Sequence, residues 1–123
     1  NPKKKNHFSV DERLNMIKEV VKDLKNVSVD AGEGLTVNFA KKNGAKALIR
    51  GIRAVTDYEY ELQQASANMF LEPSIETIFF LARPEYSFLS SSSVVEMASN
   101  NGRITGLVPK CLESRIIERL STK

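Results

Sequence analysis

Two arginines flank a glycine at the end of an apolar run, in the order Ile49-Arg50-Gly51-Ile52-Arg53. A guanidinium group binds phosphate oxygens through paired N–H bonds, and glycine lets the backbone approach a ligand closely. Further along the chain is a run of serines, Ser90-Ser91-Ser92-Ser93. The amide groups at a serine-rich helix start also attract anions, because the positive end of the helix dipole lies behind them. The two motifs together predict a ligand that carries phosphate.

Each motif also has a simpler interpretation. Arg50 and Arg53 could be surface side chains that pair with Glu59 or Glu61. A serine cluster is usually a polar loop or a helix cap. The segment Lys3-Lys4-Lys5 is more often a solvated tail than a catalytic group. The residue pattern alone leaves these alternatives open.

The composition is that of an ordinary globular chain. Its 123 residues are 41% hydrophobic and 27% charged, which suffices for a normal core. The net charge of +3 comes from scattered residues, which argues against nucleic acid as a partner and favours small anionic ligands. The single cysteine, Cys111, excludes an internal disulfide, fits a reducing compartment, and is expected to be an inert packing residue. No apolar run has the length of a membrane span and no signal peptide is recognisable, so we expect a cytoplasmic protein with no membrane partner.

The elements that must position these motifs are helices alternating with strands. Helices are expected over residues 9–25, about 34–44, 57–72, 90–102 and 109–120, and strands over residues 27–29, 45–49 and 75–81. Such alternation predicts a parallel α/β sheet, in which ligands collect at the carboxyl ends of the strands. Arg50, Gly51 and Arg53 are expected at one of these ends.

Polar residues and proline mark the helix boundaries. Ser9 with Glu12, and Ser93 with Glu96, have the spacing of capping boxes. Asp57 is expected to cap the helix that follows it, which Pro73 cannot continue. These boundaries place the serine run at a helix start.

Six segments carry a resemblance to a known family: Phe8 to Arg13, Ile49 to Val55, Asp57 to Glu61, Asn68, Ile75 to Thr77, and Glu85 to Ser92. Together they closely resemble the bacterial phosphopantetheine adenylyltransferase family, and the resemblance extends to the end of the chain. It implies one nucleotidyltransferase domain over residues 1–123 with a Rossmann-like, doubly wound parallel sheet. It also implies an enzyme that transfers the adenylyl group of ATP to 4'-phosphopantetheine, which yields dephospho-coenzyme A and pyrophosphate in coenzyme A synthesis.

The resemblance assigns roles to individual positions. Lys4 and Arg53 match catalytic positions, and Lys4, Thr36 and Arg50 match positions that contact phosphopantetheine. Positions that match ATP contacts are Gly51, Ile52, Arg53, Glu61, Tyr86, Ser87, Phe88, Leu89, Ser90, Ser91 and Ser92. No residue is expected to hold a metal directly, because Mg²⁺ would be bound mainly through the ATP phosphates.

One family motif is missing from the chain. The family's Thr/His-x-Gly-His motif belongs upstream of Asn1, and its histidine stabilises the transition state, a contribution of about 3 to 4 kcal/mol for a donor of that kind. His7 has no Gly-His context and is interpreted as a surface loop residue. At Ser99, many family members have an arginine, so one phosphate contact is in doubt.

The same comparison implies a missing piece of the fold. In the family's strand order, 3-2-1-4-5, this chain supplies the last three strands, and the strand at residues 27–29 would have no partner. We therefore expect an N-terminal strand-helix-strand piece outside the chain, and we expect the chain alone to be inactive and unable to fold natively.

Two alternative functions stay open. The chain could be an incomplete fragment that binds nucleotide or coenzyme A without turnover, as the missing histidine motif suggests. It could also be a related nucleotidyltransferase for glycerol phosphate or nicotinamide mononucleotide, although the segments at residues 50–53 and 58–61 disfavour this. The resemblance further implies a homohexamer, and Tyr60, Met69, Phe79 and Phe80 are expected in the core or at a subunit interface.

Overall fold

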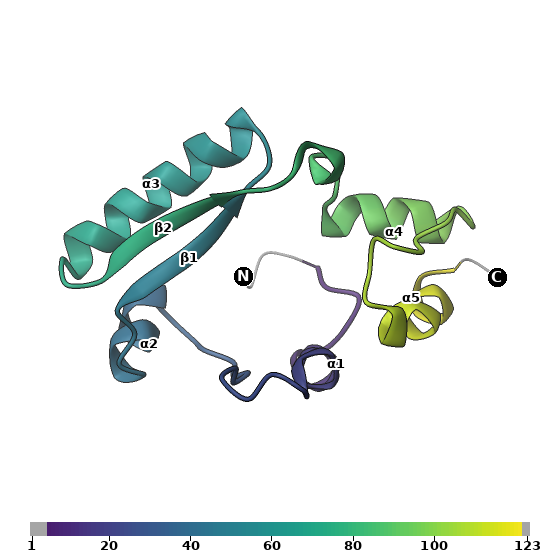
Figure 1. Cartoon of the computed structure of the whole chain (residues 1–123), viewed down its shortest axis with the longest axis horizontal. Coiled ribbons are helices and arrows are strands. Elements are labelled where there is room, and N and C mark those ends of the chain that lie inside the picture. The colour runs from purple at the N-terminus through teal and green to yellow at the C-terminus, as the bar shows by residue number, and fades with distance from the viewer. Residues whose placement is uncertain (1–4, 122–123) are drawn as a thin grey trace. The chain divides into compact units, whose positions relative to one another are not determined.

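A computed structural model describes residues 5–121 of the chain (Figure 1). Contacts divide it into two compact units. The sheet unit comprises Gly32–Phe88, and the helical unit combines the residues before Gly32 with those from Leu89 onward. The expectation of one nucleotidyltransferase domain stays a prediction.

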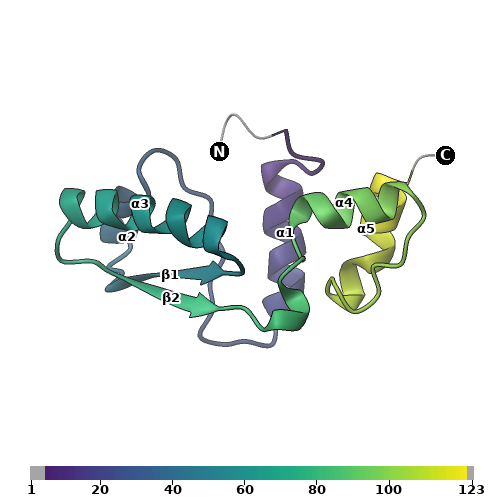
Figure 2. The same ribbon diagram turned by 90° about the horizontal axis from the view of Figure 1, so that it is seen from above.

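The sheet unit is a strand-helix-strand unit preceded by a short helix. Its elements are α2 (Thr36–Lys42), β1 (Ala47–Ile52), α3 (Val55–Leu71), β2 (Glu76–Leu81) and the 3₁₀ turn η1 (Pro84–Tyr86). The strands β1 and β2 pair in parallel, in a register that runs from Ala47 opposite Glu76 to Ile52 opposite Leu81. Helix α3 makes the crossover between them (Figure 2). The predicted α/β class with parallel strands is therefore confirmed.

Helix α3 covers one face of the two-stranded sheet. Ile52 is buried on this face, and Tyr58 of α3 meets Phe79 of β2 edge to face at 6.3 Å between ring centroids. On the opposite face, Ile49 and Phe80 are 66% and 61% exposed. The prediction that residues 75–81 form a strand is therefore confirmed, but within the sheet unit a helix covers only one of its faces, so the strand is not buried on both.

The helical unit is built from α1 (Val10–Val21), α4 (Ser91–Ser99), the 3₁₀ turn η2 (Lys110–Leu112) and α5 (Glu113–Leu120). Apolar side chains from all of these elements form one core. Its buried members are Met16, Ala98, Ile104, Leu112, Ile116 and Leu120, with Phe8 and Val94 packed against them. Asn101, at a φ of 58°, and Gly102, whose N–H donates to the Met97 carbonyl at 2.7 Å, end α4 as expected.

Several predicted boundaries were wrong. Helix α1 ends at Val21 and a turn follows, in which the Leu24 N–H donates to the Val21 carbonyl at 2.9 Å. Val27 to Val29 form no strand, because no described segment pairs with their backbone and a strand needs such a partner. The predicted 109–120 helix is a 3₁₀ turn followed by α5.

Strand β1 lies further along the chain than the predicted 45–49 strand. It covers Ala47–Ile52, because its pairing with β2 continues to Ile52. Arg50 and Gly51 are therefore inside the strand, and Arg53 follows it.

Two predicted helix caps were also misplaced. Helix α3 begins at Val55 with Ala54 as its N-cap, so Asp57 lies within the first turn and its carboxylate accepts the Arg53 N–H at 3.0 Å. Helix α4 begins at Ser91, and its capping box is Ser90 with Ser93. The predicted capping box of Ser93 with Glu96 was therefore wrong. The pair of Ser90 with Ser93, which has the same spacing, forms the box instead.

Some expected core residues are exposed. Cys111 is exposed, so the prediction that it is a packing residue was wrong. Tyr60, Met69 and Phe80 are 59%, 49% and 61% exposed, which excludes them from the core of this chain. Their place at a subunit interface stays a prediction. Within residues 5–121, no helix is long and apolar enough to cross a membrane.

Candidate functional site

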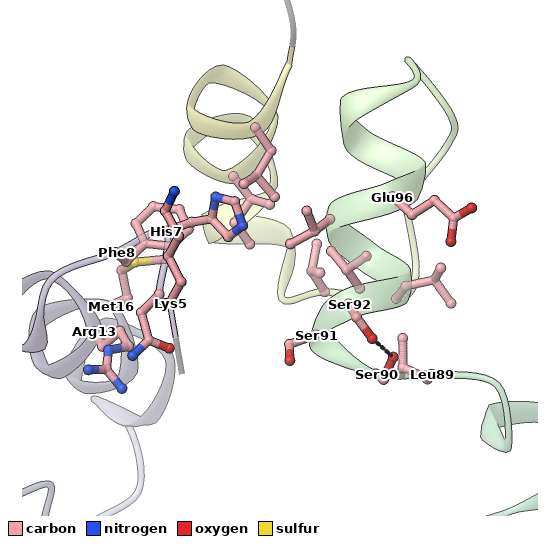
Figure 3. A pocket seen from close by; sticks show the side chains of 17 residues that line it. Lys5, His7, Phe8, Arg13, Met16, Leu89, Ser90, Ser91, Ser92 and Glu96 are labelled. Carbon is pink, nitrogen blue, oxygen red and sulfur yellow. Dashed lines mark hydrogen bonds between the residues drawn. The ribbon is translucent and has the colours of Figure 1, made fainter. Parts of the chain in front are cut away.

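A pocket of about 870 Å³ opens within the helical unit (Figure 3). One wall is the segment Lys5–Phe8 together with Arg13 and Met16 of α1. Facing it are Leu89 and the first turns of α4. Apolar side chains of α5, with Leu107 and Val108, complete the lining. The pocket thus joins the predicted serine motif to the segment that directly follows Lys4 in sequence. Lys4 itself lies outside the described residues.

The serine run forms the N-terminus of α4. The Ser93 N–H donates to Ser90 Oγ at 3.0 Å, and the Ser90 N–H donates to Ser93 Oγ at 2.8 Å. The Ser90 and Ser92 hydroxyls lie 2.9 Å apart and form a further hydrogen bond (Figure 3). These bonds fix the backbone at the helix start, where amide groups and the positive end of the helix dipole favour an anion. The predicted helix start at the serine run is confirmed.

The opposite wall is anchored by the start of α1. The Glu12 carboxylate accepts the Ser9 N–H at 2.7 Å, and Ser9 Oγ accepts the Glu12 N–H at 3.1 Å, so the predicted capping box is confirmed. A side-chain hydrogen bond from Arg119, supported by the Ser9 N–H, lowers the pKa of Glu12 to about 2. His7 is exposed in a bend before α1 and lines the pocket, in agreement with its interpretation as a surface loop residue.

In the sheet unit, Arg50 is engaged with a buried carboxylate. Its Nε and Nη2 donate to the two carboxylate oxygens of Glu61 at 2.8 and 2.6 Å. This bidentate bond lowers the pKa of Glu61 and raises that of Arg50. The Glu61 side chain is 10% exposed and the Arg50 side chain 55%, so the arginine is still accessible to an anion.

Arg53 is engaged in the same way with an acidic side chain of α3. Its Nε and Nη2 donate to the carboxylate of Asp57 at 3.0 and 3.1 Å, and this hydrogen bonding lowers the pKa of Asp57. The simpler interpretation of the two arginines, pairing with acidic residues, is therefore realised for Arg50 with Glu61. For Arg53 the structure shows a pair with Asp57, an acidic residue that this interpretation did not name.

The remaining predicted positions are distributed over both units. Thr36 is the exposed first residue of α2, and Gly51 has open space where a Cβ would lie. Tyr86 ends η1, and Ser87 and Phe88 are the last residues of the sheet unit. Leu89 to Ser92 belong to the helical unit, where they line the pocket. The ligand contacts themselves stay predictions.

Sequence reasoning missed the apolar part of the pocket. Met16, Ile116 and Leu120 line it from α1 and α5. The periodicity of these helices identifies their apolar faces, but it does not say which of those residues border a cavity. Among residues 5–121, no three His, Cys, Asp or Glu side chains are grouped so as to hold a metal ion.

A family model describing cytidylyltransferase-like proteins matches residues 1–97. The chain belongs to this family. A curated relative, the phosphopantetheine adenylyltransferase of Caldanaerobacter subterraneus subsp. tengcongensis, is 47% identical over 119 residues, which cover 97% of this chain and 74% of that protein. Membership of the cytidylyltransferase-like family identifies the chain as part of a nucleotidyl-transferring enzyme, in agreement with the α/β fold and parallel strands.

Proposed function

We propose that this protein transfers the adenylyl group of ATP to 4'-phosphopantetheine, giving dephospho-coenzyme A and pyrophosphate. The observation that carries the proposal is the 47% identity, over 97% of the chain, to a protein of that name. The pocket supports it, because the serine-rich start of α4 and the segment next to Lys4 border one cavity.

The reaction is an in-line displacement at phosphorus. A phosphate oxygen of phosphopantetheine forms a bond to the α-phosphorus of ATP, and the bond from that phosphorus to the β-phosphate oxygen breaks as pyrophosphate leaves. No covalent enzyme intermediate is needed, so positioning and charge neutralisation account for the catalysis. In this proposal the α4 amides and Lys4 neutralise the phosphates of ATP, together with Arg53.

Arg50 would hold the phosphate of phosphopantetheine, and Thr36 would line the same subsite through its backbone. Because Arg50 is bound to Glu61 through Nε and Nη2, the incoming phosphate would share the guanidinium with that carboxylate or displace it. Glu61 therefore contributes by orienting Arg50, in addition to the nucleotide contact that the family resemblance implies.

Other properties of the proposed enzyme follow from the resemblance. Mg²⁺, held mainly by ATP phosphate oxygens, would offset the charge of the leaving pyrophosphate. The principal histidine would come from a Gly-His motif upstream of Asn1. The protein would act in the cytoplasm as a homohexamer, bind coenzyme A and dephospho-coenzyme A, and have neither nucleic acid nor membrane partners.

A pyrophosphate-release assay tests the proposal on two proteins, the 123-residue chain and a version extended upstream to include the Gly-His motif. We expect release from the extended protein with ATP and phosphopantetheine, and none from the chain alone. Release only with glycerol phosphate or nicotinamide mononucleotide would assign a different substrate. If the extended protein binds ATP in calorimetry but releases no pyrophosphate with any of these acceptors, the function is binding without turnover.

A further inference from the structure

Arg119, near the end of α5, bonds to the segment before α1. Its Nη1 donates to the His7 carbonyl at 2.8 Å and to Glu12 Oε2 at 3.2 Å, and its Nη2 donates to Glu12 Oε1. The guanidinium carbon lies 4.7 Å from the centroid of the Phe8 ring, which is the geometry of a cation–π contact. One side chain thus holds three neighbouring parts of the chain that are remote from it in sequence.

The segment that Arg119 holds has little regular structure of its own. Residues 5–8 precede α1 in bends and coil, so no helix or strand ladder fixes their backbone. They nevertheless form one wall of the pocket. Glu12 continues the same network, because the oxygen that accepts from Arg119 Nη1 also accepts the Ser9 N–H at 2.7 Å.

Arg119 does not itself line the pocket. Any effect that it has on a bound ligand must therefore act through the segment that it holds. Lys4, the position that matches a catalytic lysine, directly precedes that segment in sequence. The segment that Arg119 holds therefore adjoins, in sequence, a position that the resemblance assigns to catalysis.

We propose that Arg119 is a positioning residue that fixes the Lys5–Phe8 wall of the pocket and thereby keeps the pocket in the shape that its phosphate ligand requires. This inference rests on the adenylyl transfer proposed above. A displacement of about 1 Å in a positioned group can reduce a rate about 100-fold, so a loosened wall should lower the rate without unfolding the protein.

The same two helices provide a matched control. Arg115 of α5 pairs with Glu19 of α1 at 3.4 Å, and their side chains are 50% and 37% exposed. The corresponding values for Arg119 and Glu12 are 42% and 40%. Arg115→Gln therefore removes a similar ion pair between α5 and α1 without touching residues 5–8.

The test compares Arg119→Gln, Arg119→Lys and Arg115→Gln in the protein that releases pyrophosphate. For Arg119→Gln we expect a kcat about tenfold lower, a KM for ATP within about twofold of the original, and faster hydrogen exchange at residues 5–9. Arg119→Lys should recover part of the kcat, because lysine can donate to the His7 carbonyl but lacks the planar fork. Arg115→Gln should leave kcat, the KM for ATP and the hydrogen exchange at residues 5–9 unchanged.

Equal kcat values for Arg119→Gln and Arg115→Gln, or unchanged exchange at residues 5–9, would overturn the inference. If Arg119→Gln does not fold, Arg119→Lys decides the question, since a folded variant with undiminished kcat would also overturn it. If the unsubstituted protein transfers no adenylyl group, the proposed function fails instead. Hydrogen exchange then still decides whether Arg119 orders the segment.

Discussion

At the scale of single residues, Arg50 has two roles, one in folding and one in binding. Its guanidinium satisfies the buried Glu61 carboxylate through two bonds, while the resemblance assigns it to the phosphate of phosphopantetheine. These roles are compatible, because a 55% exposed arginine can bind a second anion without leaving the first. Substitution of Arg50 will therefore affect both binding and folding, and the two effects must be separated.

For Arg50→Ala we expect phosphopantetheine affinity to fall about 10- to 100-fold, since a charge-assisted hydrogen bond contributes about 1.5 to 3 kcal/mol. ATP affinity should change much less. Calorimetry with each ligand measures the difference. Glu61→Gln, which retains Arg50 but weakens the ion pair and alters a proposed nucleotide contact, shows how much of the loss comes from breaking the pair. Equal losses for both ligands in Arg50→Ala would reject the assignment.

Thr77 in β2 offers a second prediction at this scale. Within residues 5–121 its buried hydroxyl oxygen has no hydrogen-bond partner, which is an unfavourable arrangement. Thr77→Val replaces the hydroxyl with a methyl group of similar size, and we expect the free energy of unfolding to rise by about 1 kcal/mol. Urea denaturation measures it, with Thr56→Val on the exposed surface of α3 as the control. A destabilised Thr77→Val would show that the hydroxyl has a partner in solution.

At the scale of elements, caps and strand pairing decide where each helix and strand begins. The spacing of serines predicted a helix start at residues 90–93 but did not choose between Ser90 and Ser93 as the N-cap. The structure selects Ser90 as the N-cap. The Ser93 hydroxyl instead accepts the Ser90 N–H, as the N3 partner of that cap.

The cap itself gives a prediction for α4. Ser90→Ala removes the oxygen that accepts the Ser93 N–H, and we expect a loss of about 1 kcal/mol in the free energy of unfolding. Ser92→Ala should cost much less, because the exposed Ser92 hydroxyl bonds only to Ser90 Oγ among the described contacts. Thermal or urea denaturation compares the two. Equal losses would mean that the N-cap lies elsewhere.

At the scale of the whole molecule, four carboxylates in the described part of the chain have pKa values below their ordinary range. Hydrogen bonds from Arg119, Arg53, Arg50 and Lys41 are the leading causes for Glu12, Asp57, Glu61 and Glu72, respectively. A carboxylate whose pKa is lower in the folded state stabilises the fold above its unfolded pKa. That stability is lost as the pH falls through the folded value.

We therefore expect stability to decline on acidification, and for Glu12 the decline should occur between its ordinary pKa of 4.5 and about 2. The urea midpoint, measured from pH 6 downward in steps, should fall in this range. Glu12→Gln should be less stable at neutral pH and should show a smaller decline in acid. If its pH profile is parallel to that of the original protein, Glu12 is not responsible.

The sheet unit leaves apolar side chains of its two strands exposed on one face. Ile49, Ile78 and Phe80 are 66%, 44% and 61% exposed on the face opposite α3. Such a face normally packs against another layer, because doubly wound parallel sheets are covered on both sides. The exposed face agrees with the expectation that further strands and helices belong to this fold, and with the failure of residues 27–29 to form a strand.

Except at residues 27–29, the sequence by itself determined which segments are helices and which are strands, together with the parallel α/β class, the capping box of α1 and the serine-rich start of α4. These features depend on local spacing of apolar and capping residues, which can be read within a window of a few turns. The tertiary structure alone decided that Arg50 binds Glu61, that Arg119 holds the segment before α1, and that apolar residues of α1 and α5 border the pocket. Contacts of this kind join residues far apart in sequence, and they depend on how the elements pack, which local spacing does not encode.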